Sequence, residues 1–89
     1  MKPSLNRTIY CIYDNCIFKT KVMFLGKYSF IQEEFGSCYE EESWEYNYDD
    51  YGRTWFTSFE KAKAKMLEDK PNKKLVKTGI TFWEVKNND

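Results

Sequence analysis

The chain has 89 residues, a length that fits one domain, 1–89, and leaves no room for a second. Its 14 basic and 14 acidic side chains cancel, and it has no histidine. Without histidine the usual general base near neutral pH is missing, and no Gly-rich phosphate loop is present, so we expect a non-enzymatic binding protein. No run of about 20 apolar residues is present, and no apolar segment follows Met1. The sequence therefore predicts a cytoplasmic protein without membrane contact.

Three cysteines, Cys11, Cys16 and Cys38, occur at irregular spacing. An odd number fits no disulfide framework of a small secreted domain, and the spacing matches no common zinc pattern. We expect three buried, reduced thiols, and neither a metal nor another cofactor.

The first half of the chain reads as strands. Residues 8–13 and 16–25 are β-branched and aromatic, and Asp14-Asn15 between them suits a two-residue hairpin turn. This turn places Tyr13 opposite Cys16 and Cys11 opposite Phe18, so the two cysteines are not cross-strand partners. Alternation along the second strand predicts one buried face and one wet face. The predicted buried residues are Cys16, Phe18, Val22 and Phe24, with Lys19 and Lys21 on the wet face.

Further elements follow with weaker signals. A turn at Gly26-Lys27 leads into a third strand at 28–32, and residues 38–48 contain a possible fourth strand that their acidic residues disfavour. Residues 49–52 read as a turn, and 54–56 as the end of a strand.

One helix is predicted over about 58–69. Thr57 and Glu60 fit a capping box at its start, and Pro71 ends it. Phe59, Ala62 and Met66 form its apolar stripe. Residues 75–85 then read as a strand or a hairpin broken at 78–79. In that segment Ile80 and Phe82 are expected on one face, and Thr81, Trp83 and Val85 on the other.

This order of elements indicates the α+β class. We expect a small antiparallel sheet of four or five strands, with the helix packed on one face. A small SH3-like barrel carrying a helix is the alternative.

Charge is segregated along the chain. Residues 33–52 hold eight acids, no base and six aromatic rings. Carboxylates can occupy phosphate positions in a basic groove while rings supply contact area, so this segment resembles a DNA mimic that docks onto a nucleic-acid-binding surface of another protein. The alternative is that the acids only solvate an exposed loop. The predicted partner-binding residues are Tyr39, Glu40, Glu41, Glu42, Trp44, Glu45, Tyr46, Tyr48, Asp49, Asp50 and Tyr51.

Lysines in the second half of the chain suggest an alternative function. They could bind phosphates and make the chain a nucleic-acid-binding accessory protein. The zero net charge and the divergent helix positions of Lys61 and Lys63 argue against direct nucleic-acid binding. The residues concerned are Lys61, Lys65, Lys70, Lys73, Lys74 and Lys77. A structural or assembly domain that self-associates through a sheet edge is a third alternative.

The segment 54–63, TWFTSFEKAK, resembles a pattern in small uncharacterised proteins of low-GC Gram-positive bacteria and their phages. In that pattern a strand ends in an aromatic pair and a Thr/Ser-capped helix follows. The resemblance covers about a fifth of the chain and carries no catalytic residue. It implies a phage or mobile-element protein of the anti-defence kind, such as an anti-CRISPR inhibitor, whose partner is a host protein such as a CRISPR effector.

Overall fold

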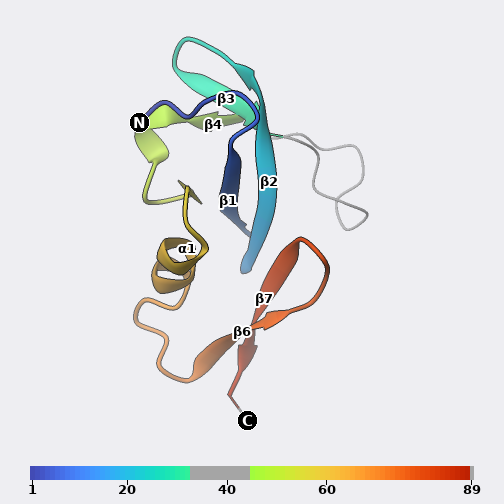
Figure 1. Ribbon diagram of the computed structural model, residues 1–89. Coiled ribbons are helices and arrows are strands. Elements are labelled where there is room, and N and C mark those ends of the chain that lie inside the picture. The colour runs from blue at the N-terminus through green and yellow to red at the C-terminus, as the bar shows by residue number, and fades with distance from the viewer. Residues whose placement is uncertain (33–44, 89) are drawn as a thin grey trace.

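The computed structural model describes residues 1–32 and 45–88, which form seven strands and one α-helix (Figure 1). Every pair of named strands is antiparallel, which confirms the α+β class. The elements are β1 (Thr8–Tyr13), β2 (Cys16–Leu25), β3 (Ser29–Gln32), β4 (Glu45–Asn47), the 3₁₀ helix η2 (Tyr48–Asp50), β5 (Trp55–Phe56), α1 (Phe59–Met66), β6 (Lys73–Lys77) and β7 (Phe82–Asn87). The sheet exceeds the four or five strands expected, because β4 and β5 are separate strands and the last segment folds back into two.

The β1–β2 hairpin matches its prediction. Asp14 and Asn15 have φ values of 48° and 62°, the left-handed conformation that a two-residue turn requires. Tyr13 pairs with Cys16 and Cys11 with Phe18. Cys11 and Cys16 are accordingly buried without a disulfide.

β2 is the strand that both halves of the sheet share. Its first half pairs with β1 on one edge and with β7 on the other, while its last residues pair with β3, which leads to β4. The register shifts between Val22 and Phe24, and an irregularity of this kind bends and twists a strand. The sheet therefore curls into a half-barrel, with β3 and β4 folded over β1 (Figure 1).

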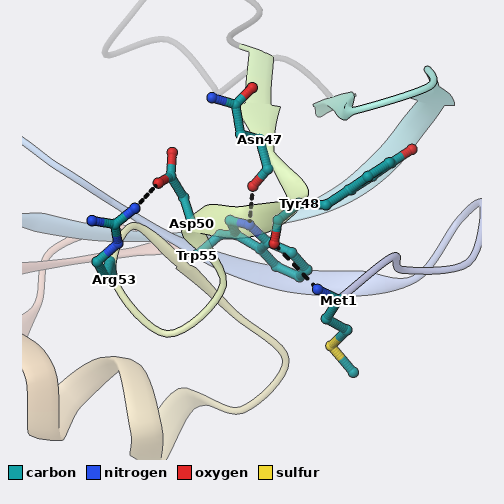
Figure 2. Close-up of polar contacts among 6 residues, drawn as sticks. All are labelled: Met1, Asn47, Tyr48, Asp50, Arg53 and Trp55. Atoms are coloured by element: carbon teal, nitrogen blue, oxygen red, sulfur yellow. Dashed lines mark hydrogen bonds and ion pairs between the residues drawn. The ribbon is translucent and has the colours of Figure 1, made fainter.

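Alternation along β1 divides the core into two clusters. Ile9 and Cys11 point into the hollow of the half-barrel, where they meet Phe30 and Trp55. The Trp55 ring lies edge-on to Phe30 at a centroid distance of 4.9 Å. Its Nε1–H donates to the Asn47 carbonyl oxygen at 2.9 Å, which ties η2 and β4 to the core (Figure 2).

The second cluster lies on the other face of the sheet, beneath α1. Ala62 and Met66 are buried there against Ile17 and Phe56, and Phe59 packs at the edge, 4.6 Å from the Trp83 ring centroid. The predicted apolar stripe of the helix is thus confirmed, and so is its packing on one face. None of the helices in the described part of the chain is long and apolar enough to cross a membrane.

The start of the helix differs from its prediction by one residue. α1 begins at Phe59, and its N-cap is Ser58, whose Oγ accepts a hydrogen bond from the Lys61 N–H at 3.4 Å. Thr57 instead places its Oγ1 3.1 Å from the Tyr51 hydroxyl. Glu60 is then only two residues from the cap, so the capping box does not form. The helix also ends earlier, at Met66, and Asp69 in the following turn has a φ of 59°.

The C-terminal segment is a hairpin of β6 and β7. Phe82 stacks on Phe18 in the hollow of the half-barrel, whereas Trp83 and Val85 join the cluster under α1, as alternation predicts. Ile80 does not share the face of Phe82. It lies in the turn before β7 with 90% of its surface exposed, because the strand period begins only at Phe82.

Candidate interaction surface

The predicted acidic segment is only partly within the described residues. Tyr39, Glu40, Glu41, Glu42 and Trp44 lie outside them, and Glu45 to Tyr51 lie within. The described members occupy β4, η2 and the residue that follows.

Among the described members of this segment, Tyr46 and Tyr48 belong to the core, and Tyr51 packs against it. Tyr46 and Tyr48 are 8% and 9% exposed, and both rings stack on Phe30. The Tyr48 hydroxyl donates to the Gly26 carbonyl oxygen at 2.7 Å, and the half-buried Tyr51 ring lies 4.8 Å from Trp55. Their burial corrects the expectation that Tyr46 and Tyr48 contact a partner. The period-two spacing of these two tyrosines, which β4 follows, is the sequence signal for this burial.

The acidic members behave differently from one another. Glu45 and Asp49 are exposed, and neither forms an ion pair within the described part of the chain. Asp50 is half-buried, and its Oδ1 lies 2.5 Å from Nη2 of Arg53, so it already has a cation beside it (Figure 2). Two carboxylates of this group therefore remain available to a partner.

Exposed apolar side chains gather on the β2–β3 hairpin. Phe24 and Tyr28 are 65% and 71% exposed, and Met23, Leu25 and Ile31 of the same hairpin are also exposed. Phe24 pairs with Ile31, and Ile31 pairs with Glu45, so these three residues form one row across β2, β3 and β4. We call this row the hairpin surface, and Tyr28 and Asp49 lie beyond it, at the turn end of the same hairpin. A concentration of apolar side chains on one element marks an interaction site, whereas scattered ones do not.

Phe24 reaches this surface through the irregularity in β2. Strict alternation puts it on the same face as Val22, which is fully buried. The register shift between the two residues turns Phe24 to the opposite face, beside Ile31. The prediction that Phe24 is a core residue is thus wrong.

The rim of the hairpin surface carries charges of both signs. Glu45 ends the row, Lys21 is exposed on β2, and the Lys27 ammonium lies 5.2 Å from the centroid of the Tyr28 ring. Tyr28 is held in place because its carbonyl oxygen accepts from the Tyr48 N–H at 2.9 Å, which also sets Asp49 at this end of the hairpin. An apolar centre with a polar, charged rim is the usual anatomy of a protein–protein interface.

The predicted nucleic-acid-binding lysines are exposed but spread over several elements. Lys61 and Lys65 lie on α1, where Lys65 pairs with Glu68 at 3.1 Å, and Lys70 lies in the turn that follows. The remaining three, Lys73, Lys74 and Lys77, are on β6. The structure therefore does not bring all six together, and only the β6 group shares one element.

The buried thiol of Cys11 is suited to packing rather than to chemistry. Burial raises its pKa to about 12, although a hydrogen bond with Tyr46 acts in the opposite direction. Burial and the neighbouring Cys11 likewise raise the pKa of the Tyr46 hydroxyl. A thiol with a raised pKa is a poor nucleophile. Across residues 1–32 and 45–88, His, Cys, Asp and Glu side chains form no group of three that could hold a metal ion.

Comparison of the chain with protein-family models, with curated proteins and with solved structures finds no match.

Proposed function

We propose that this chain is a small, non-enzymatic binding protein that docks the hairpin surface onto a second protein. The observation that supports this most strongly is the row of Phe24, Ile31 and Glu45, in which an aromatic ring stays 65% exposed although its strand is paired with β3. Leaving such a ring in water forgoes roughly 1.5–3 kcal/mol that its burial would contribute. Contact with an apolar patch on a partner recovers this energy.

The carboxylates at the rim narrow the class of partner. Glu45 and Asp49 favour a protein with basic side chains around its apolar contact, a description that nucleic-acid-binding proteins fit. An inhibitor that occupies such a surface on a host protein is the member of this class that the resemblance of residues 54–63 implies. The docking residues differ from those predicted, since Phe24 and Ile31 replace Tyr46 and Tyr48 at its centre.

A pair of matched variants tests the proposal. Phe24→Ser removes the exposed ring of the hairpin surface, and Ile80→Ser removes an even more exposed apolar residue in the β6–β7 turn. A partner captured from a cell lysate by the wild-type chain is purified, and its affinity for each variant is measured by calorimetry. We expect Phe24→Ser to weaken binding by about tenfold or more, and Ile80→Ser to leave it within about twofold. Equal affinity of the wild type and Phe24→Ser would contradict the proposal.

A further inference from the structure

β6 forms an open edge of the sheet. Its one strand partner within residues 1–32 and 45–88 is β7, which in turn pairs with β2. The β6–β7 hairpin lies at the end of the molecule opposite to β3 and β4 (Figure 1). β6 has five residues, whereas the other two edge strands, β4 and β5, have three and two, so β6 is the longest edge open to a further strand.

The register fixes which backbone groups of β6 point outward. Asn88 N–H donates to the Asn72 carbonyl oxygen at 3.0 Å, and Thr78 N–H donates to that of Phe82 at 3.1 Å. Both pairs continue the β6–β7 register, and in an antiparallel ladder hydrogen-bonded pairs alternate with non-hydrogen-bonded ones. Lys74 and Val76 therefore bond to β7, while Leu75 and Lys77 turn their N–H and C=O groups away from it. The Lys73 carbonyl points the same way by the same alternation, whereas the Lys73 N–H donates to the Lys70 carbonyl oxygen at 3.2 Å.

The side chains along this edge are basic or apolar. The sequence of β6 is KKLVK, and none of its three lysines forms an ion pair with any described residue. Lys73 hydrogen-bonds the Asn87 side chain, and the Lys77 ammonium lies 5.8 Å from the centroid of the Trp83 ring. Lysines on an edge repel a second copy of the same strand. The same charges attract a strand of opposite sign.

We propose that the β6 edge binds an extended acidic peptide segment of another protein as an added strand. The outward N–H and C=O groups of Leu75 and Lys77 supply the main-chain hydrogen bonds, and the side chains select the sequence. This site is separate from the hairpin surface, so it can exist whether or not the proposed function is correct.

The side chains of β6 define the peptide that fits. Directly opposite residues in an antiparallel pair share a face of the sheet. Acidic residues therefore belong opposite Lys73, Lys74 and Lys77, and apolar residues opposite Leu75 and Val76. Read from its amino end, an antiparallel partner has the pattern acid, apolar, apolar, acid, acid.

The test uses a fluorescent peptide with the core Glu-Val-Val-Glu-Glu between neutral flanks, titrated with the full chain. Two N-methylated forms provide matched controls of identical charge. In the bound register the N–H of the third core residue faces Leu75, and that of the second faces away. We expect N-methylation of the third residue to weaken binding at least about tenfold, and of the second by less than about twofold. An equal loss of affinity in both N-methylated peptides, or no binding of the unmodified peptide, overturns the proposal.

Variants of the protein supply the complementary measurement. Lys77→Gln removes the charge and keeps the outward N–H, whereas Lys77→Pro removes both at a position that does not bond to β7. We expect Lys77→Gln to weaken binding about two- to fivefold and Lys77→Pro to abolish it. Circular dichroism and thermal melting confirm that both variants are folded.

Two other outcomes would also overturn the proposal. One is binding of a single-stranded oligonucleotide that competes with the peptide and is insensitive to Lys77→Pro, which would make the edge a phosphate-binding patch. The other is a dimer, seen by analytical ultracentrifugation, that Lys77→Pro dissociates. In that case a second copy of this chain occupies the edge.

Discussion

At the scale of single residues, the start of α1 depends on one hydroxyl. Ser58 Oγ accepts from the Lys61 N–H, while the neighbouring Thr57 hydroxyl contacts Tyr51. We expect Ser58→Ala to lower the free energy of unfolding by about 0.5–1 kcal/mol, because one N–H of the first helical turn then lacks its side-chain acceptor. Urea denaturation measures this change. Ser58→Asp serves as the control, since it keeps a capping oxygen and should retain the stability of the wild type. An equal loss in both variants would show that Ser58 does not cap the helix.

The raised pKa of Cys11 makes the stability of the fold depend on pH. Its pKa rises to about 12 in the folded chain, whereas an unfolded thiol ionises near 8.5. Between these values the folded state binds more protons than the unfolded state, so stability falls as pH rises through this window, by up to about 1.4 kcal/mol per pH unit. Below about pH 8 the contribution of Cys11 is constant.

Cys11→Ala tests this linkage. The variant is less stable at pH 7 because it leaves a small cavity, yet its stability should decline less steeply than that of the wild type between pH 9 and 11. Urea midpoints at several pH values measure both slopes. The raised pKa of Tyr46 leaves some decline in the variant. Parallel slopes in the two proteins would contradict the assignment to Cys11.

At the scale of elements, the register of β6 predicts an alternation of amide exchange. The Leu75 and Lys77 amides point away from β7 and should exchange with solvent rapidly. The Lys74 and Val76 amides bond to β7 and should be protected. Hydrogen exchange followed by NMR resolves these four amides. Protection at Leu75 and Lys77 would show that the outer edge of β6 is already paired.

Elements with strong local signals were predictable from the sequence. The Asp14-Asn15 turn determined the register of the first hairpin, and the spacing of Ala62 and Met66 identified the buried side of the helix. These features depend on residues close together in the chain. The exposure of Phe24 has a different origin, since it follows from a shift in the pairing of β2 with β3. A register shift inside a strand pair leaves no pattern in the alternation of residue types, so the central residue of the candidate site was assigned to the core.

Tyr46 of β4 and Tyr48 of η2 show the reverse error. Their acidic neighbours suggested a surface segment, but Tyr46 and Tyr48 pack on Phe30 in the hollow of the half-barrel. Composition averages over both faces of a strand, whereas burial alternates between them. Within β4 the acid and the ring therefore belong to opposite faces, and only the acid remains at the surface.

At the scale of the whole molecule, charge reversal at the rim separates the roles of charge and apolar contact. We expect the double variant Glu45→Lys, Asp49→Lys to weaken partner binding about threefold or more at low salt, with a smaller effect as salt screens the rim. Neither residue has an ion pair among the described residues, so the fold should persist. The affinities of the wild type and of the double variant for the partner, measured at several ionic strengths, test both expectations.

A second double variant provides the control for this charge change. Glu60→Lys, Glu68→Lys alters the net charge equally, but on and just after α1, away from the hairpin surface. It should bind the partner like the wild type. If both double variants weaken binding equally, the overall charge matters and the rim does not.

The most direct measurement of the central claim places a photocrosslinking side chain on the molecule in a living cell. Benzoylphenylalanine replaces Phe24 in one variant, Ile80 in a second and Lys63 on α1 in a third, all of them exposed positions. If the hairpin surface is the binding site, illumination should join the partner to the chain at position 24, and the yield at positions 63 and 80 should be lower by about tenfold or more. Equal yields at the three positions, or a partner joined only at 63 or 80, would contradict the claim.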